Sequence, residues 1–115
     1  MTDDEEKAVA AKAELSPEEE ARARILGETA KIAWSELQRI FAAGKAVAVS
    51  PELDLVEVAY QMSVDNKTTI DTWMDSGQVS VVSDAQALEW LEANALMWAC
   101  VVKPWVLVQP ILQKQ

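Results

Sequence analysis

The sequence predicts a small single-domain α+β fold in which helices pack on a three-stranded sheet. Its 115 residues match the size of one ordinary domain, and half of them are hydrophobic while a quarter are charged. Helix-like and strand-like hydrophobic patterns follow each other in the order α-β-α-α-β-α-β. Residues 16–110 contain no repeat and no low-complexity linker, so we expect them to form one globular unit.

The two ends of the chain are predicted to lie outside this unit. Residues 1–15 form an acidic tail that we expect to be disordered or transiently helical, and residues 111–115 form a short polar end. The formal net charge is −9, and residues 1–20 hold eight of the 19 acidic residues. This charge disfavours nonspecific contact with nucleic acids and with anionic membranes.

The first predicted helix covers residues 17–43. Ser16 is a suitable N-cap, Pro17 fits the first helical position, and Glu19 completes a capping box. Apolar residues then alternate at spacings of four and three, which predicts a single buried face. They are Leu26, Ala30, Ala33, Leu37 and Ile40, with Trp34 and Phe41 beside them. Gly44 is a natural residue to end this helix.

Short elements follow. Residues 45–49 alternate weakly and predict a strand. Asp54 and Glu57 form a second capping signature for a helix over 54–65, and a shorter helix is expected over 68–75. Residues 78–82 include three valines and predict another strand.

The last predicted helix begins at the N-cap Ser83, with Gln86 completing its capping box. Residues 97–108 are apolar at nearly every position, which predicts one strand that is covered on both faces. Pro104 cannot donate a ladder hydrogen bond, so we expect a bulge or an edge stretch at that point.

This order of elements is also that of a winged helix, with residues 54–65 and 68–75 as the helix-turn-helix. A mixed three-stranded sheet with helices on one face is the alternative. A recognition helix needs cationic and polar side chains. Residues 68–75 instead offer Asp71 and Asp75, and Lys67 is the only nearby cation. Nucleic-acid binding is therefore a secondary hypothesis.

No catalytic, metal or cofactor site is predicted. The chain has no histidine, which removes the commonest general base and most zinc sites. Cys100 lies in an apolar run and is expected to be an inert core thiol. The carboxylates of Asp65, Asp71 and Asp75 are of a type that binds hard cations such as Ca²⁺, but their spacing matches no calcium-binding loop. A solvent-exposed helix face explains these three residues better.

The predicted interaction surface is the last strand. Trp98 and Trp105 have opposite parity along it, although Pro104 is able to reset that parity. One of the two rings is then expected to be exposed, and an exposed Trp is a good interface anchor. We therefore take Trp98, Trp105 and Leu107 as the candidate surface for a protein partner or for self-association.

Several short segments resemble a known family. They are residues 28–34 (ETAKIAW), 36–39 (ELQR), 53–59 (LDLVEVA), Trp73 with Gly77, and 104–109 (PWVLVQ). The family is the bacterial domain of unknown function numbered 2288, and the resemblance covers nearly all of residues 25–109. It implies a bacterial, cytoplasmic, stand-alone domain, and it brings no activity, cofactor, partner or catalytic residue with it.

The leading functional hypothesis is a non-enzymatic protein-interaction or regulatory module. A winged-helix-like nucleic-acid-binding protein is the first alternative, and a carboxylate-dependent enzyme is the second. A small-molecule ligand is left open. The cytoplasm is the expected location, because the sequence shows neither the pattern of a signal peptide nor a run of about 20 apolar residues that would span a bilayer.

Overall fold

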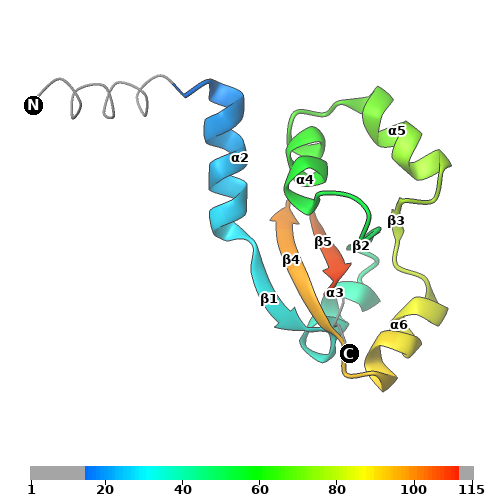
Figure 1. The fold of residues 1–115 in the computed structure, drawn as a ribbon. Coiled ribbons are helices and arrows are strands. Elements are labelled where there is room, and N and C mark those ends of the chain that lie inside the picture. The colour runs from blue at the N-terminus through cyan, green and yellow to red at the C-terminus, as the bar shows by residue number, and fades with distance from the viewer. Residues whose placement is uncertain (1–14, 112–115) are drawn as a thin grey trace, which may run out of the picture.

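A five-stranded mixed sheet crosses the molecule, as the computed structural model in Figure 1 shows for residues 15–111. Its strands run in the spatial order β1-β4-β5-β2-β3. Their bounds are Ala30–Ala33 for β1, Ala46–Val49 for β2, Val79–Val81 for β3, Leu96–Val102 for β4 and Trp105–Pro110 for β5. The central pair β5 and β2 is parallel and the other three pairings are antiparallel, so β1 and β3 form the two edges.

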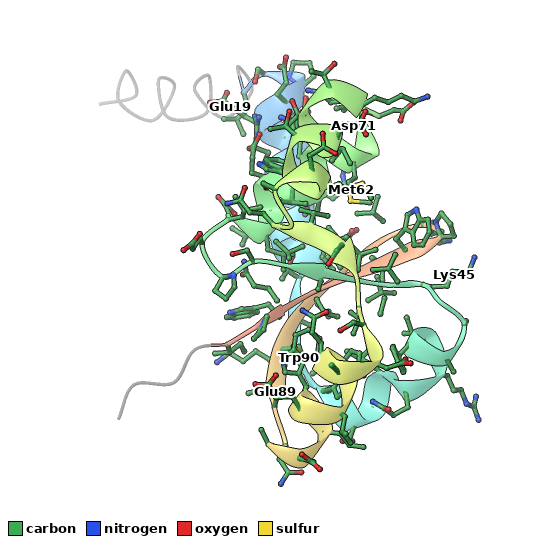
Figure 2. The ribbon with its side chains drawn as sticks, turned by 90° about the vertical axis from the view of Figure 1, so that its right-hand side faces the viewer. Glu19, Lys45, Met62, Asp71, Glu89 and Trp90 are labelled. Atoms are coloured by element: carbon green, nitrogen blue, oxygen red, sulfur yellow. The ribbon has the colours of Figure 1, made fainter. Side chains whose placement is uncertain are left out.

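Helices cover both faces of this sheet, and Figure 2 shows the strands between the two helical layers. The helices are α2 (Pro17–Glu28), the 3-10 helix η1 (Trp34–Leu37), α3 (Gln38–Ala42), α4 (Leu55–Ser63), α5 (Lys67–Asp75) and α6 (Asp84–Glu92). One face packs against η1, α3 and α6. The other packs against α2, α4 and α5, and we call it the α4 face.

Alternation along the strands divides the core in two. In β2, Ala46 and Ala48 join the cluster that packs against η1 and α6. Val47 and Val49 join the other cluster, which packs against α4. This is the period of two that a strand imposes on its side chains. All four residues are buried, because both faces of this central strand are covered.

Trp34 anchors the first of these clusters. It is fully buried, and its indole Nε1 donates a hydrogen bond of 2.9 Å to the carbonyl of Ala87 in α6. Its ring makes edge-on contacts with Trp90 at 5.1 Å and with Phe41 at 5.8 Å between centroids. One side chain thereby connects η1, α3 and α6.

The prediction of a three-stranded sheet is wrong, and so is the element order on which the winged-helix hypothesis depended. The described residues contain five strands, and two of these were not expected: β1, and the separate β5. The small single-domain α+β class agrees with the structure. The predicted tail at residues 1–15 lies almost wholly outside the described residues, as does most of the end at 111–115.

The predicted helix over 17–43 is broken after Glu28. Thr29 has an extended backbone, and its hydroxyl donates to the Ile25 carbonyl at the end of α2. The following residues, Ala30–Ala33, leave the helix to pair with β4. Leu26, which the pattern placed on a buried face, is 64% exposed.

The predicted single strand over 97–108 is a hairpin. Lys103 and Pro104 form its turn, with a cis peptide bond between them, and β4 and β5 pair on either side. Pro104 therefore lies in the turn between β4 and β5 instead of forming a bulge within one strand. The chain reverses there, and Val102 faces Trp105 across the hairpin.

The helix starts agree better with the predictions. Ser16 with Glu19 and Ser83 with Gln86 form complete capping boxes. Asp54 also caps α4, but Glu57 does not take part in that cap. Within residues 15–111, the helices are too short or too polar to traverse a lipid bilayer.

The carboxylate of Glu57 instead fixes α2 to α4. Both of its oxygens accept hydrogen bonds from the Arg22 guanidinium, at 2.7 and 3.2 Å, and Gln61 donates to the second oxygen at 2.7 Å. The guanidinium also lies 4.2 Å above the Tyr60 ring. These contacts hold an otherwise exposed helix against the sheet layer.

Candidate functional site

Trp105 is the first residue of β5 and faces the α4 face of the sheet. The hairpin turn sets this direction, because Trp105 pairs with Val102 and the two side chains point to the same side. The ring packs against the core cluster below α4 but remains partly exposed. The ring lies near Met62, at the C-terminal end of α4.

An apolar hollow of about 190 Å³ lies beside this ring. Its floor is formed by strands β2 and β3, and its walls by Trp105 and by helices α4 and α5. The lining residues are Val47, Met62, Ile70, Met74, Val79, Ser80, Val81 and Trp105. Met74 and Val81 are 50% and 51% exposed, so this apolar wall is open to solvent.

A second hollow of about 210 Å³ adjoins the first and shares Met62, Ile70 and Trp105 with it. This one carries charge: its remaining lining residues are Asp65, Lys67, Asp71, Val102 and Lys103. The Nζ atom of Lys45 lies 5.9 Å from the centre of the Trp105 ring. We name the two hollows together, with Lys45, the Trp105 groove.

Figure 2 looks onto this side of the molecule. Met62 and Asp71 lie in the upper helical layer, and Lys45 lies at the start of β2. Trp90 and Glu89 belong to α6 in the lower layer and are not part of the groove. The groove thus combines a flexible, sulfur-rich apolar wall with cationic side chains, an arrangement suited to holding a side chain of a partner.

The structure does not bring the three predicted surface residues together. Leu107 is fully buried below α4 and opposite Cys100. Trp98 lies on the same sheet face as Trp105, on the far side of Leu107. The two rings face the same side despite their opposite sequence parity, because the turn at Pro104 separates them into two strands. Of the three, only Trp105 lies in the groove.

Trp98 lines a separate hollow of about 240 Å³ between α2 and the loop before α4. The exposed Leu26 borders it, and the Lys31 Nζ lies 5.2 Å from the centre of the Trp98 ring. This hollow shares no lining residue with the Trp105 groove. We therefore treat the two as independent surfaces.

Most of the groove residues were not predicted from the sequence. Met62 and Met74 fall within the predicted helices over 54–65 and 68–75 but received no role in a site, and neither did Lys45, Val81 and Lys103. These residues come from three elements (α4, α5 and β3), from the residue before β2 and from the hairpin turn, and no spacing rule connects them. The one available signal was Lys103-Pro104, which separates Trp105 from the preceding apolar run.

The titratable groups with shifted pKa values lie outside the groove. Hydrogen bonds from Arg22 and then Gln61 lower the pKa of Glu57. Burial raises the pKa of the Cys100 thiol, which lies in the core. Among residues 15–111, no three His, Cys, Asp or Glu side chains are grouped to hold a metal ion, and Asp65, Asp71 and Asp75 are no exception.

Comparisons with known proteins give a consistent result. The family model DUF2288, described as a protein of unknown function, matches residues 20–110. The solution structure of PA1075 from Pseudomonas aeruginosa is similar in fold, with a TM-score of 0.73 and 39% sequence identity. That similarity covers 89% of this chain and 93% of PA1075. No curated protein matches the chain.

Proposed function

The chain belongs to the DUF2288 family, as its sequence segments predicted, and on that premise we propose that it is a non-enzymatic protein-interaction module that binds its partner in the Trp105 groove. The family description assigns no activity, so the proposal rests on the groove itself. The observation that carries it is the open apolar wall formed by Met74 and Val81 beside the ring of Trp105.

Met74 and Val81 lie together in this wall and are both about half exposed. Clustered apolar side chains that stay exposed mark interaction sites more often than isolated ones do. Trp is enriched among the residues that dominate binding energy, and Met adapts its shape to an incoming side chain. Trp105, Met62 and Met74 supply both properties within one groove.

The size of the groove also supports a side chain as its occupant. Typical small-molecule sites enclose roughly 300–1,000 Å³. The two hollows measure about 190 and 210 Å³, so each suits one large side chain better than a cofactor. A buried aromatic side chain removes roughly 150–250 Å² from water, which is worth about 4–6 kcal/mol before the costs of association.

Nucleic acid is a less suitable partner. Residues 15–111 carry 14 Asp and Glu against seven Lys and Arg, so an extended phosphate backbone would meet charge of its own sign beyond the groove. A carboxylate-dependent enzyme has little support in the groove, because Lys67 and Lys103 line the same hollow as Asp65 and Asp71.

We further propose that the module acts in the bacterial cytoplasm. The similar protein PA1075 is bacterial, and the single cysteine is a free buried thiol, as is usual in a reducing compartment. Cell fractionation with an antibody against the native chain tests this location. Recovery in the membrane or secreted fraction would contradict it.

Affinity purification from the source organism tests the interaction. Tagged full-length chains are compared as wild type, as Met74→Lys, and as Leu88→Lys. Leu88 is a matched control, because it is 56% exposed on α6 at the opposite face of the sheet. We expect a stoichiometric protein partner with the wild type and with Leu88→Lys, and its loss with Met74→Lys.

Two results would contradict the proposal. One is a partner that Met74→Lys retains but Leu88→Lys loses, which would place the binding surface on α6. The other is nucleic acid that co-purifies with the wild type and resists moderate salt, since the binding energy would then not depend on an apolar groove.

A further inference from the structure

Building on the proposed function, we propose that the Trp105 groove binds a partner segment in which one large apolar side chain has acidic residues close to it in the sequence. The apolar side chain enters the hollow lined by Met74 and Val81, and the acidic residues lie along Lys45 and Lys103. The partner class is thus defined by an apolar anchor with an acidic flank.

The distribution of cations supports this partner. The described residues are strongly acidic, with seven Lys and Arg against 14 Asp and Glu in 15–111. Three of the seven cations belong to the groove: Lys45, Lys67 and Lys103. An acidic protein that places three of its few cations around a partly exposed tryptophan presents a surface complementary to negative charge.

Two of these lysines are available for a partner. The only ion pair within residues 15–111 joins Arg22 and Glu57, so neither Lys45 nor Lys103 has a carboxylate within 4.0 Å in this part of the chain. Lys67 is less available, because Asp65 and Asp71 line the same hollow. The acidic flank should therefore depend on Lys45 and Lys103 more than on Lys67.

The layout of the groove determines how close the anchor and the acids must be. The apolar and the charged hollow meet at Met62, Ile70 and Trp105, so they share one boundary. The ammonium of Lys45 lies 5.9 Å from the centre of the Trp105 ring, which lines both hollows. Since neighbouring residues of a chain are 3.8 Å apart, an anchor and an acid within a few positions reach both hollows.

Binding of this kind should be sensitive to salt. Each exposed ion pair with Lys45 or Lys103 strengthens binding by roughly two- to fivefold, and salt screens this contribution. The contribution of the apolar anchor is unaffected by moderate salt. The two parts of the interaction can therefore be separated by charge-reversal and apolar variants.

A phage-displayed library of random dodecapeptides, selected on the full-length protein, tests the inference. The proteins compared are the wild type, Met74→Lys, the double variant Lys45→Glu/Lys103→Glu, and Arg39→Glu. Arg39 is an exposed cation on α3, away from the groove, and so controls for a change in net charge. Circular dichroism and thermal melting establish that each variant is folded.

We expect the wild type and Arg39→Glu to enrich peptides that carry Trp, Phe or Leu within a few positions of Asp or Glu. The lysine double variant should bind those peptides at least tenfold more weakly, and Met74→Lys should not retain them. Neutral or basic peptides that need Met74 but not the lysines would overturn this inference and leave the proposed function standing. Enrichment that is unaffected by Met74→Lys, or no enrichment at all, would overturn both.

Discussion

The substitution Trp105→Ala separates a groove residue from a core residue, and Trp34→Ala provides the comparison. Both positions carry tryptophan, and both rings pack against the sheet. Trp34 is fully buried, whereas Trp105 keeps part of its ring in contact with water. The same change in side-chain volume should therefore have different effects on folding at the two sites.

The magnitudes follow from burial. Removing a fully buried tryptophan costs about 3–5 kcal/mol, and Trp34→Ala also removes the hydrogen bond to Ala87 and two aromatic contacts. That loss is comparable to the whole stability of many domains, about 5–15 kcal/mol. For Trp105→Ala we expect about 1–2 kcal/mol, which lowers the melting temperature by roughly 4–8 °C per kcal/mol.

Urea denaturation followed by circular dichroism measures both losses, and peptide or partner binding is measured on the same samples. We expect Trp105→Ala to fold and to lose binding by at least tenfold. The reasoning would be refuted if Trp105→Ala destabilised the fold as strongly as Trp34→Ala. It would be refuted equally by a folded Trp105→Ala that binds as the wild type does.

Further predictions concern the ion pair, the cysteine and a helix cap. Arg22 lowers the pKa of Glu57 in the folded chain below its ordinary 4.5. The unfolded chain therefore binds more protons than the folded chain as the pH drops through 4.5, so the free energy of unfolding should fall below that pH. Glu57→Gln should flatten that dependence in urea titrations between pH 3 and 6; an unchanged slope would refute it. The Cys100 thiol, buried and with a raised pKa, should react with a thiol reagent only in urea, and rapid reaction of the folded protein would contradict its burial. Ser83→Ala removes the hydroxyl that accepts from the Gln86 amide and should cost about 1 kcal/mol in thermal melting, whereas no loss would mean that water replaces this cap.

Local signals in the sequence predicted the starts of α2, α4 and α6 well. The capping boxes at Ser16 and Ser83 are each formed by residues three positions apart, so they depend on nothing remote. Gly44, predicted to end a helix, follows α3 with a positive φ of 74°, as glycine allows. Where the chemistry of an element lies within one turn, the sequence was sufficient.

Strand β1 was missed because its pairing partner is far away. The residues from Leu26 to Ile40 have a spacing that fits one helix, and nothing local stops it except Gly27 and Thr29. What turns residues 30–33 into a strand is the ladder with β4, in which Ala30 pairs with Ala99. Tertiary pairing outweighed local propensity, as it often does for short strands.

Hydrophobic periodicity predicted neither the hairpin nor the groove, and the reasons differ. Apolar residues continue on both sides of Lys103-Pro104, so hydrophobicity alone does not show the turn. The groove needs Met62, Met74 and Val81 to converge from α4, α5 and β3, and only the fold places them together. The contact between Arg22 and Glu57 was also not predicted, because the two residues are 35 positions apart in the sequence.

Site-specific photo-crosslinking in living cells tests the central claim most directly. A benzoylphenylalanine residue is introduced at position 74 inside the Trp105 groove or, as a control, at position 88 on α6, and adducts are identified by mass spectrometry. If the groove is the binding surface, position 74 yields a discrete adduct with a protein that carries an apolar residue next to acidic ones, and position 88 does not. Adducts formed equally at both positions, or at position 88 alone, would contradict the account.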